Sequence, residues 1–180
     1  MNTSGKKTPL NPNTVPDTPW EIISVDLIGP LPESKGKNAI MVIVDRFSKM
    51  IQLFLVSTKI TSQGMVKIFR DEIFKLHGIP KKVISDQGPQ FVSSFMKELY
   101  SQLQIEGNPS TTYYPKTDGQ TERINVWVKQ YLCIYINHRQ LDWVKWLSIT
   151  EFAHNQTSSS TTTFSPFLLN YRQQPQSGFA

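Results

Sequence analysis

Cysteine is almost absent from this chain of 180 residues, because Cys133 is the only one. A single thiol cannot form an internal disulfide, and a cysteine-based zinc site needs at least two thiolates. No apolar run approaches the roughly 18 residues that cross a bilayer. The polar N-terminus also lacks the apolar stretch of a secretory signal. These absences argue against a disulfide scaffold, a cysteine-rich zinc module and a membrane partner.

Positive charge forms no dense cluster, although the formal net charge is +5. Only Lys6-Lys7 and Lys81-Lys82 are adjacent cations, and there is no arginine-rich tail. The absence of a basic region or recognition-helix motif argues against a transcription factor. The basic balance itself favours a polyanionic partner such as nucleic acid. With 38% hydrophobic and 18% charged residues, we expect one globular domain with a hydrophobic core.

Strand-like runs separated by turns occupy the N-terminal part of the chain. Residues 1–19 hold four prolines among small polar residues, which predicts an extended lead-in. Strands are predicted over residues 20–27, 39–44 and 51–56, and their spacing favours an antiparallel meander. The run 39–44 is apolar throughout, as is typical of a strand buried on both faces.

Helical periodicity begins near residue 62. Apolar residues recur at helical spacing over 62–77, and Gly78 marks the end of this predicted helix. A short strand at 82–85 and a helix at 94–103 follow. This strand, helix, strand, helix order implies a parallel crossover connection. Residues 107–119 are rich in Gly, Asn, Pro, Ser and Thr, and they predict a flexible loop.

Three further helices are predicted after that loop. The first begins at Thr117, which can cap the helix with Gln120 as its partner, and its apolar stripe runs to about Asn137. The second covers residues 143–154. The third opens at Ser165-Pro166, where a capping residue precedes a proline at the first helical position.

This order of elements predicts an α/β fold. Three antiparallel strands with parallel additions form a mixed sheet, and helices cover its faces. We expect one core domain over residues 20–175, after the lead-in and before a short tail at 176–180.

Three acidic residues lie where a solvated charge is unusual. Asp26 is inside an apolar strand, Asp86 follows the strand at 82–85, and Glu122 is in the first turns of a helix. A buried charge is costly unless it is paired or binds a metal. Converging carboxylates suit Mg²⁺, which prefers oxygen ligands. Two such ions, about 3.5–4 Å apart, stabilise the attacking and leaving oxygens of a phosphoryl displacement.

Each acidic residue also has an ordinary interpretation. Asp26 could be an edge residue, Asp86 could belong to a turn, and Glu122 could be a solvated helix residue. Helix geometry favours the site, because Glu122, Asn125 and Lys129 fall on a face away from the apolar stripe. That face would offer a metal ligand, an amide and a cation to a DNA backbone. Spacing and periodicity alone leave both interpretations open.

Short motifs occur in order along nearly the whole chain, from about Trp20 to Tyr171. They are PWE at 19–21, DLIGPLP at 26–32, VDRFSK at 44–49, LHGIP at 76–80, SDQGPQF at 85–91, YPKTDGQTER at 114–123, EFA at 151–153 and SPF at 165–167. Exactly 35 residues separate Asp86 from Glu122. This set resembles the catalytic core of retroviral and LTR-retrotransposon integrases, most closely the Ty3/gypsy type.

The resemblance implies an RNase H-like fold with a five-stranded mixed sheet. It implies two Mg²⁺ or Mn²⁺ ions held by the catalytic carboxylates of Asp26, Asp86 and Glu122. It also implies a polynucleotidyl transferase that works in two steps. Water first attacks near the 3′ end of the element's DNA, and the freed 3′ hydroxyl then attacks a phosphodiester of target DNA.

The resemblance also implies binding partners. By position, it implies DNA contacts at Tyr113, Lys116, Asp118, Asn125 and Lys129. The implied partners are element ends, target DNA and a second core, within a larger assembly that acts in the nucleus. The family's zinc-binding N-terminal module and its C-terminal module are not in this sequence, so we expect a fragment of a polyprotein product.

The sequence departs from the family pattern in the loop, where Tyr114-Pro115-Lys116 replaces the commoner His-Pro-Gln. Gln87 also stands where arginine is common. Two other interpretations stay open. A ribonuclease H would share the fold, but SDQGPQF, TDGQTER and the 35-residue interval argue against it. A host-adapted, non-catalytic core would be favoured by loss of a carboxylate, and all three are present.

Overall fold

A mixed sheet lies at the centre of the computed structural model, which describes residues 16–107, 120–135 and 142–178. Its strands lie in the order β3 (Ile51–Val56), β2 (Ala39–Asp45), β1 (Ile22–Ile28) and β4 (Lys82–Ile84). The pairs β1–β2 and β2–β3 are antiparallel, whereas β1 and β4 are parallel. The predicted meander and its parallel addition are confirmed. Within the described ranges the sheet has four strands, not the five that the resemblance implies.

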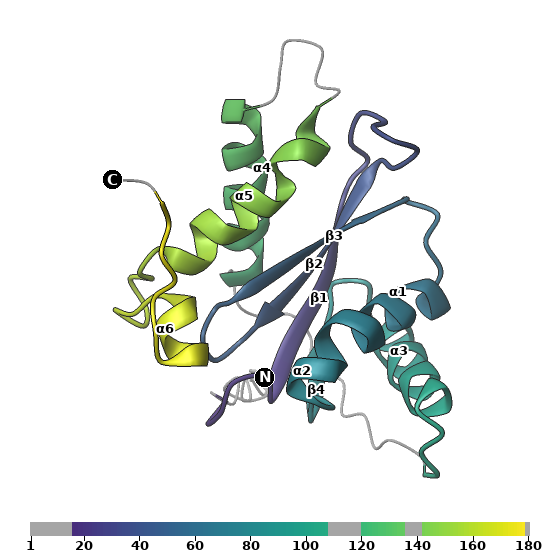
Figure 1. Cartoon of the computed structure of the whole chain (residues 1–180). Helices are drawn as coiled ribbons and strands as arrows, with labels where there is room; N and C mark the ends of the chain where they lie inside the picture. The colour runs from purple at the N-terminus through teal and green to yellow at the C-terminus, as the bar shows by residue number, and fades with distance from the viewer. Residues whose placement is uncertain (1–15, 108–119, 136–141, 179–180) are drawn as a thin grey trace, which may run out of the picture.

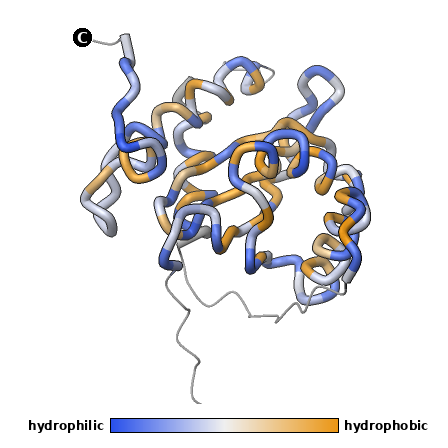
Figure 2. The backbone as a smooth tube through the Cα atoms, turned by 60° about the horizontal axis from the view of Figure 1, so that its bottom comes forward, coloured by the Kyte–Doolittle hydropathy of each residue, from blue (hydrophilic) through white to orange (hydrophobic). Residues whose placement is uncertain are grey.

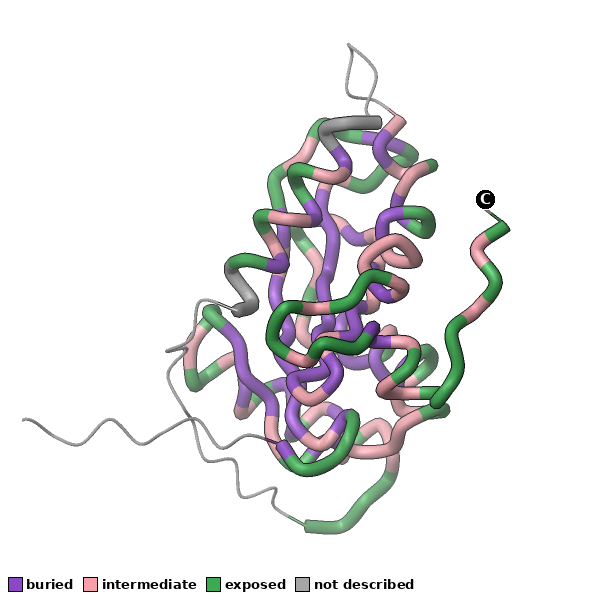
Figure 3. Tube along the Cα trace, turned by 90° about the vertical axis from the view of Figure 1, so that its left-hand side faces the viewer, coloured by how far each residue is buried: buried purple, intermediate pink, exposed green. Residues whose placement is uncertain are grey.

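Helices cover both faces of this sheet (Figure 1). Every residue of β2 is buried, which explains its unbroken apolar run. Alternate side chains of the strands enter two separate clusters, one against α1 and α3 and the other against α4 and α5. Apolar colour gathers on the sheet and the inner sides of the helices (Figure 2), and burial follows the same pattern (Figure 3).

The first face is covered by one long helical run and by α3. The run comprises α1 (Ser62–Ile68), a π-helical segment over Phe69–Phe74 and α2 (Lys75–His77). Gly78, with φ at 78°, ends it. The predicted helix over 62–77 is therefore confirmed, with a π-helical stretch in its middle.

Helix α3 (Pro89–Gln102) begins earlier than the sequence predicted. We expected a start at Ser94, but Pro89 occupies the first helical turn. Gly88, with φ at 91°, turns the chain into it. Proline is favourable at this position because its missing N–H would have no helical partner.

The second face is covered by α4 (Gln120–Tyr135) and α5 (Trp143–Gln156), with α6 (Pro166–Tyr171) beside α5. The predicted cap at Thr117 and the predicted end near Asn137 lie outside the described residues. The start of α6 is confirmed, because the Ser165 hydroxyl accepts a hydrogen bond from the backbone N–H of Leu168 at 3.2 Å. No helix within the described ranges has the length and apolar character needed to cross a membrane.

Side chains of α5 form hydrogen bonds with the backbone groups on the outer edge of β3. Asn155 accepts from the Ile51 N–H and donates to the Ile51 carbonyl, both at 2.9 Å. Glu151 accepts from the Leu53 N–H at 2.7 Å. An open strand edge would otherwise expose these groups to pairing with another chain. The EFA motif thus begins with a residue that seals the sheet.

Replacing Glu151 by glutamine is expected to remove a pH-dependent loss of stability. Burial raises the pKa of Glu151 from 4.5 to about 7, and the hydrogen bond from Leu53 only partly opposes it. As pH rises from about 4.5 to 7, the unfolded chain ionises while the folded protein stays protonated. The wild type therefore loses about 3 kcal/mol of unfolding free energy by pH 8.

Urea denaturation at pH 5 and pH 8 measures this effect. Glu151→Gln should exceed the wild type by less than about 1 kcal/mol at pH 5 and by up to about 3 kcal/mol at pH 8. Glu33→Gln, which changes an exposed carboxylate, serves as the matched control and should show no such difference. If Glu151→Gln had the same effect at both pH values, the buried-carboxylate explanation would be wrong.

Candidate active site

Asp26 is fully buried in the middle of β1. Because side chains alternate along a strand, Asp26 shares a face of the sheet with Ser24 and Ile28. Ile28 packs in the same cluster as Ile124 of α4, so this is the face that α4 covers. The aspartate is thus a carboxylate inside an apolar layer, as the sequence predicted.

Asp86 lies directly beside Asp26. The parallel pairing of β1 and β4 sets Ser24 next to Ile84, and Asp86 follows two residues later. The backbone N–H of Asp86 donates to Oδ1 of Asp26 at 3.3 Å. Asp86 itself is exposed, in the turn between β4 and α3. The backbone of Asp86, whose side chain is accessible, therefore contacts the buried carboxylate of Asp26 where β1 and β4 lie side by side.

Glu122 belongs to the first turn of α4, and its side chain is outside what the structure describes. Ile124, two residues later, is buried against the sheet face that carries Asp26. The start of the helix thus lies over that face. The structure brings two of the three predicted residues into contact, through the Asp86 N–H and the Asp26 carboxylate, and places the backbone of the third on the covering helix.

Of the predicted DNA contacts, Tyr113, Lys116 and Asp118 lie outside the described residues. Lys129 is exposed on α4. The side-chain oxygen of Asn125 is buried and has no hydrogen-bond partner among the described residues. Buried polar atoms are nearly always paired, so this oxygen is suited to a donor from a ligand.

The donor set fits a hard divalent cation. Asp26 and Asp86 offer only oxygen atoms, one from a buried side chain and one from an exposed side chain. Within the described residues, no group of three His, Cys, Asp or Glu side chains could hold a metal ion. A third carboxylate would have to come from Glu122.

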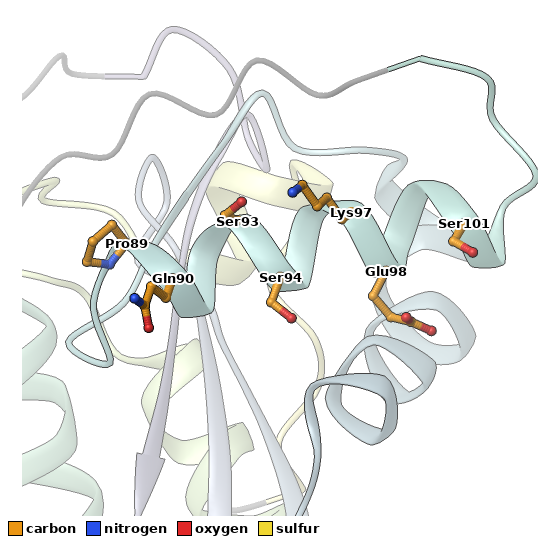
Figure 4. A pocket seen from close by; sticks show the side chains of 7 residues that line it. All are labelled: Pro89, Gln90, Ser93, Ser94, Lys97, Glu98 and Ser101. Atoms are coloured by element: carbon orange, nitrogen blue, oxygen red, sulfur yellow. The ribbon is translucent and has the colours of Figure 1, made fainter.

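A polar hollow of about 660 Å³ leads away from the Asp86 turn along α3. Figure 4 shows its lining, in which Ser93 and Lys97 point to one side of the helix and Ser94 and Glu98 to the other. No sequence pattern indicated this surface, because its residues lie on the polar side of an ordinary amphipathic helix. The hollow offers hydroxyl groups, one cation and one carboxylate along the helix that follows the Asp86 turn.

The sequence matches known proteins over most of its length. A family model described as Integrase core domain matches residues 16–115. The Transposon Tf2-3 and Tf2-4 polyproteins of Schizosaccharomyces pombe are each 36% identical over 168 residues, which is 93% of this chain. The chain spans about 12% of the length of those polyproteins.

Solved structures show the same fold. The HTLV-2 integrase catalytic core domain in complex with magnesium, in its trimeric form, has a TM-score of 0.61 and 22% identity, covering 86% of this chain and 99% of that one. A chain of the simian T-cell lymphotropic virus intasome, in complex with the PP2A regulatory subunit B56 gamma, has a TM-score of 0.67 and 21% identity. It covers 99% of this chain and 66% of that one. The fold is therefore the RNase H-like fold of integrase cores, and with its family match over residues 16–115 the chain belongs to the integrase core domain family.

Proposed function

We propose that this chain catalyses 3′-end processing and strand transfer of retroelement DNA into target DNA. One observation carries the proposal, namely the hydrogen-bonded contact between Asp86 and the buried Asp26. This contact between Asp86 and Asp26 lies beneath α4, the helix whose first turn contains Glu122. Membership of the integrase core family supports the same chemistry.

Asp26, Asp86 and Glu122 would hold two Mg²⁺ or Mn²⁺ ions, which when bound would stabilise charge on the attacking and leaving oxygens. The protein's own residues fix the geometry. Burial in β1 holds Asp26 in one position, and its contact with the Asp86 N–H keeps the turn in register with the strand. Asn125 would accept a hydrogen bond and Lys129 would contact phosphate, so both would orient DNA along α4.

Two other functions share the fold. A ribonuclease H would act on an RNA–DNA hybrid, and a non-catalytic host-adapted core would only bind DNA or protein. The carboxylate pair favours catalysis over the second. We also propose that the core works as a homodimer within a larger assembly on DNA, since the HTLV-2 core has been solved in dimeric and trimeric forms.

The test uses a branched DNA that mimics the strand-transfer product, because a core alone should run the reaction backwards on it. With Mn²⁺ the wild type should reseal this DNA. Asp86→Asn and Glu122→Gln should each reduce resealing by more than about 100-fold, because each removes a metal ligand. Glu106→Gln, which changes an exposed carboxylate in the segment after α3, is the matched control and should retain activity.

Two results would contradict the proposal. Resealing that survives both substitutions would show that these carboxylates are not the catalytic ones. Cleavage of an RNA–DNA hybrid without resealing would instead favour a ribonuclease H.

A further inference from the structure

A cavity of about 340 Å³ lies between α4, α5 and the turn that joins β2 to β3. Its walls come from four separate segments of the chain. The residues that line it include Lys49, Arg123, Trp127, His154, Ser160 and Thr161. Neither Asp26 nor Asp86 lines this cavity, and its volume suits one small aromatic ligand.

One wall of the cavity is aromatic. Trp127 stacks against Tyr131 with ring centroids 4.9 Å apart and meets His154 edge-on at the same centroid distance. Nε2 of His154 lies 3.0 Å from the Lys49 carbonyl, which fixes the ring. Burial lowers the pKa of His154, so its imidazole is uncharged at neutral pH. Flat, neutral rings at fixed positions favour contact with another aromatic ring.

Two cations and a set of hydroxyl groups complete the lining. Lys49 is held in its turn by a 2.6 Å hydrogen bond from its ammonium to the Arg46 carbonyl. Arg123 is exposed on α4. Ser160 and Thr161 are exposed in a loop that closes through a hydrogen bond from the Ser159 N–H to the Phe164 carbonyl. The lining therefore joins apolar ring surface with positive charge and hydrogen-bonding groups.

We propose that this cavity binds an unpaired nucleotide of the DNA on which the enzyme acts. A nucleobase would meet the aromatic wall, and its phosphate would meet Lys49 and Arg123. Aromatic stacking with nearby cations is the usual way in which proteins hold single-stranded nucleic acid. An apolar peptide would make no use of the positive charge of Lys49 and Arg123. The inference rests on the function proposed above, since it supplies the DNA.

Helix geometry separates this subsite from the duplex-binding residues. At 100° per residue, Arg123 and Trp127 lie on one flank of α4, while Asn125 and Lys129 lie on the other. The buried stripe of α4 runs between the two flanks, against the sheet. An unpaired nucleotide would therefore leave the duplex and pass the N-terminal end of α4 to reach the cavity. Substitutions on the two flanks should affect different parts of the DNA.

The test compares three DNA probes without divalent metal. They are a blunt duplex, the same duplex with a short unpaired 5′ extension, and that extension made abasic. Wild-type protein should bind the natural extension about tenfold more tightly than the blunt duplex, and the abasic extension should lose most of this gain. A photoreactive thymine in the extension should crosslink to Trp127 or His154, as mapped by mass spectrometry.

Three variants connect the result to the cavity. Thr161→Trp, which fills the cavity, and Arg123→Ala should remove the preference for the extension and leave blunt-duplex binding unchanged. Lys145→Ala, an exposed cation on the first turn of α5, is the matched control and should keep the preference. Duplex binding with no preference for the extension, or a preference that survives Thr161→Trp, would overturn the subsite alone. A preference retained in protein that cannot reseal branched DNA would instead contradict the proposed catalysis.

Discussion

Asp26→Asn is expected to abolish resealing of branched DNA, with a loss of more than about 100-fold, while the fold stays intact. The asparagine has the shape of the aspartate and keeps an oxygen that can accept the Asp86 N–H. It lacks the negative charge that a divalent cation requires. The amide avoids the desolvation cost of a buried carboxylate, so the variant should stay folded, with a stability close to that of the wild type without metal.

Thermal unfolding in Mn²⁺ gives a second readout of the same substitution. A ligand that binds only the folded protein raises the protein's unfolding free energy, and the increase grows with the ligand concentration relative to its dissociation constant. Mn²⁺ should therefore raise the melting temperature of the wild type but not that of Asp26→Asn. Asp71→Asn, which changes an exposed carboxylate paired with Arg70, is the matched control and should keep both the activity and the Mn²⁺ response. Resealing or metal stabilisation in Asp26→Asn would show that Asp26 is not a ligand.

The strands themselves were predictable from the sequence because hydrophobic periodicity reports burial directly. The run 39–44 is apolar throughout and proved to be the strand whose residues are all buried. The start of α3 was not predictable in the same way. Its buried residues begin only at Val92, so the first turn carries no apolar stripe to reveal it. The glycine and proline that open the helix look like a simple turn in sequence.

The candidate site was predictable only in part. A charge in the middle of an apolar strand identified Asp26, and the parallel pairing of β1 with β4 accounts for its contact with Asp86. The buried oxygen of Asn125 could not be foreseen, because its surroundings come from side chains distant in sequence. The cavity beside Trp127 has the same origin, since four separate segments build it.

Two aspartates of neighbouring strands show where sequence reasoning stops. Asp26 and Asp45 are both fully buried at positions that look alike in sequence. Asp45, however, accepts hydrogen bonds from the N–H groups of Trp20, Phe47 and Ser48 and from the Ser48 hydroxyl. Its charge is satisfied by the protein itself. The structure thus shows Asp45 as the acceptor that holds the turn after β2, whereas Asp26 contacts Asp86, the second catalytic candidate.

Asp45→Ala is therefore expected to destabilise the fold severely, by about 3–5 kcal/mol of unfolding free energy. The substitution leaves several buried donors without their acceptor, and a domain of this kind has only about 5–15 kcal/mol in total. The Ser48 hydroxyl also accepts from Asn170 of α6, which in turn accepts from the Trp20 indole at 2.8 Å. Loss of Asp45 would thus loosen the turn after β2, the residues that precede β1 and the C-terminal helix together.

Urea denaturation measures this loss, and Asp45→Asn provides the graded comparison. An amide retains one acceptor oxygen, so it should keep some of the hydrogen bonds and cost less than alanine. Comparison with Asp26→Asn separates a structural carboxylate from a catalytic one. The same chemical change should lower the unfolding free energy at Asp45 and spare catalysis per folded molecule, whereas at Asp26 it should spare stability and remove catalysis. A loss below about 1 kcal/mol in Asp45→Ala would refute the structural role.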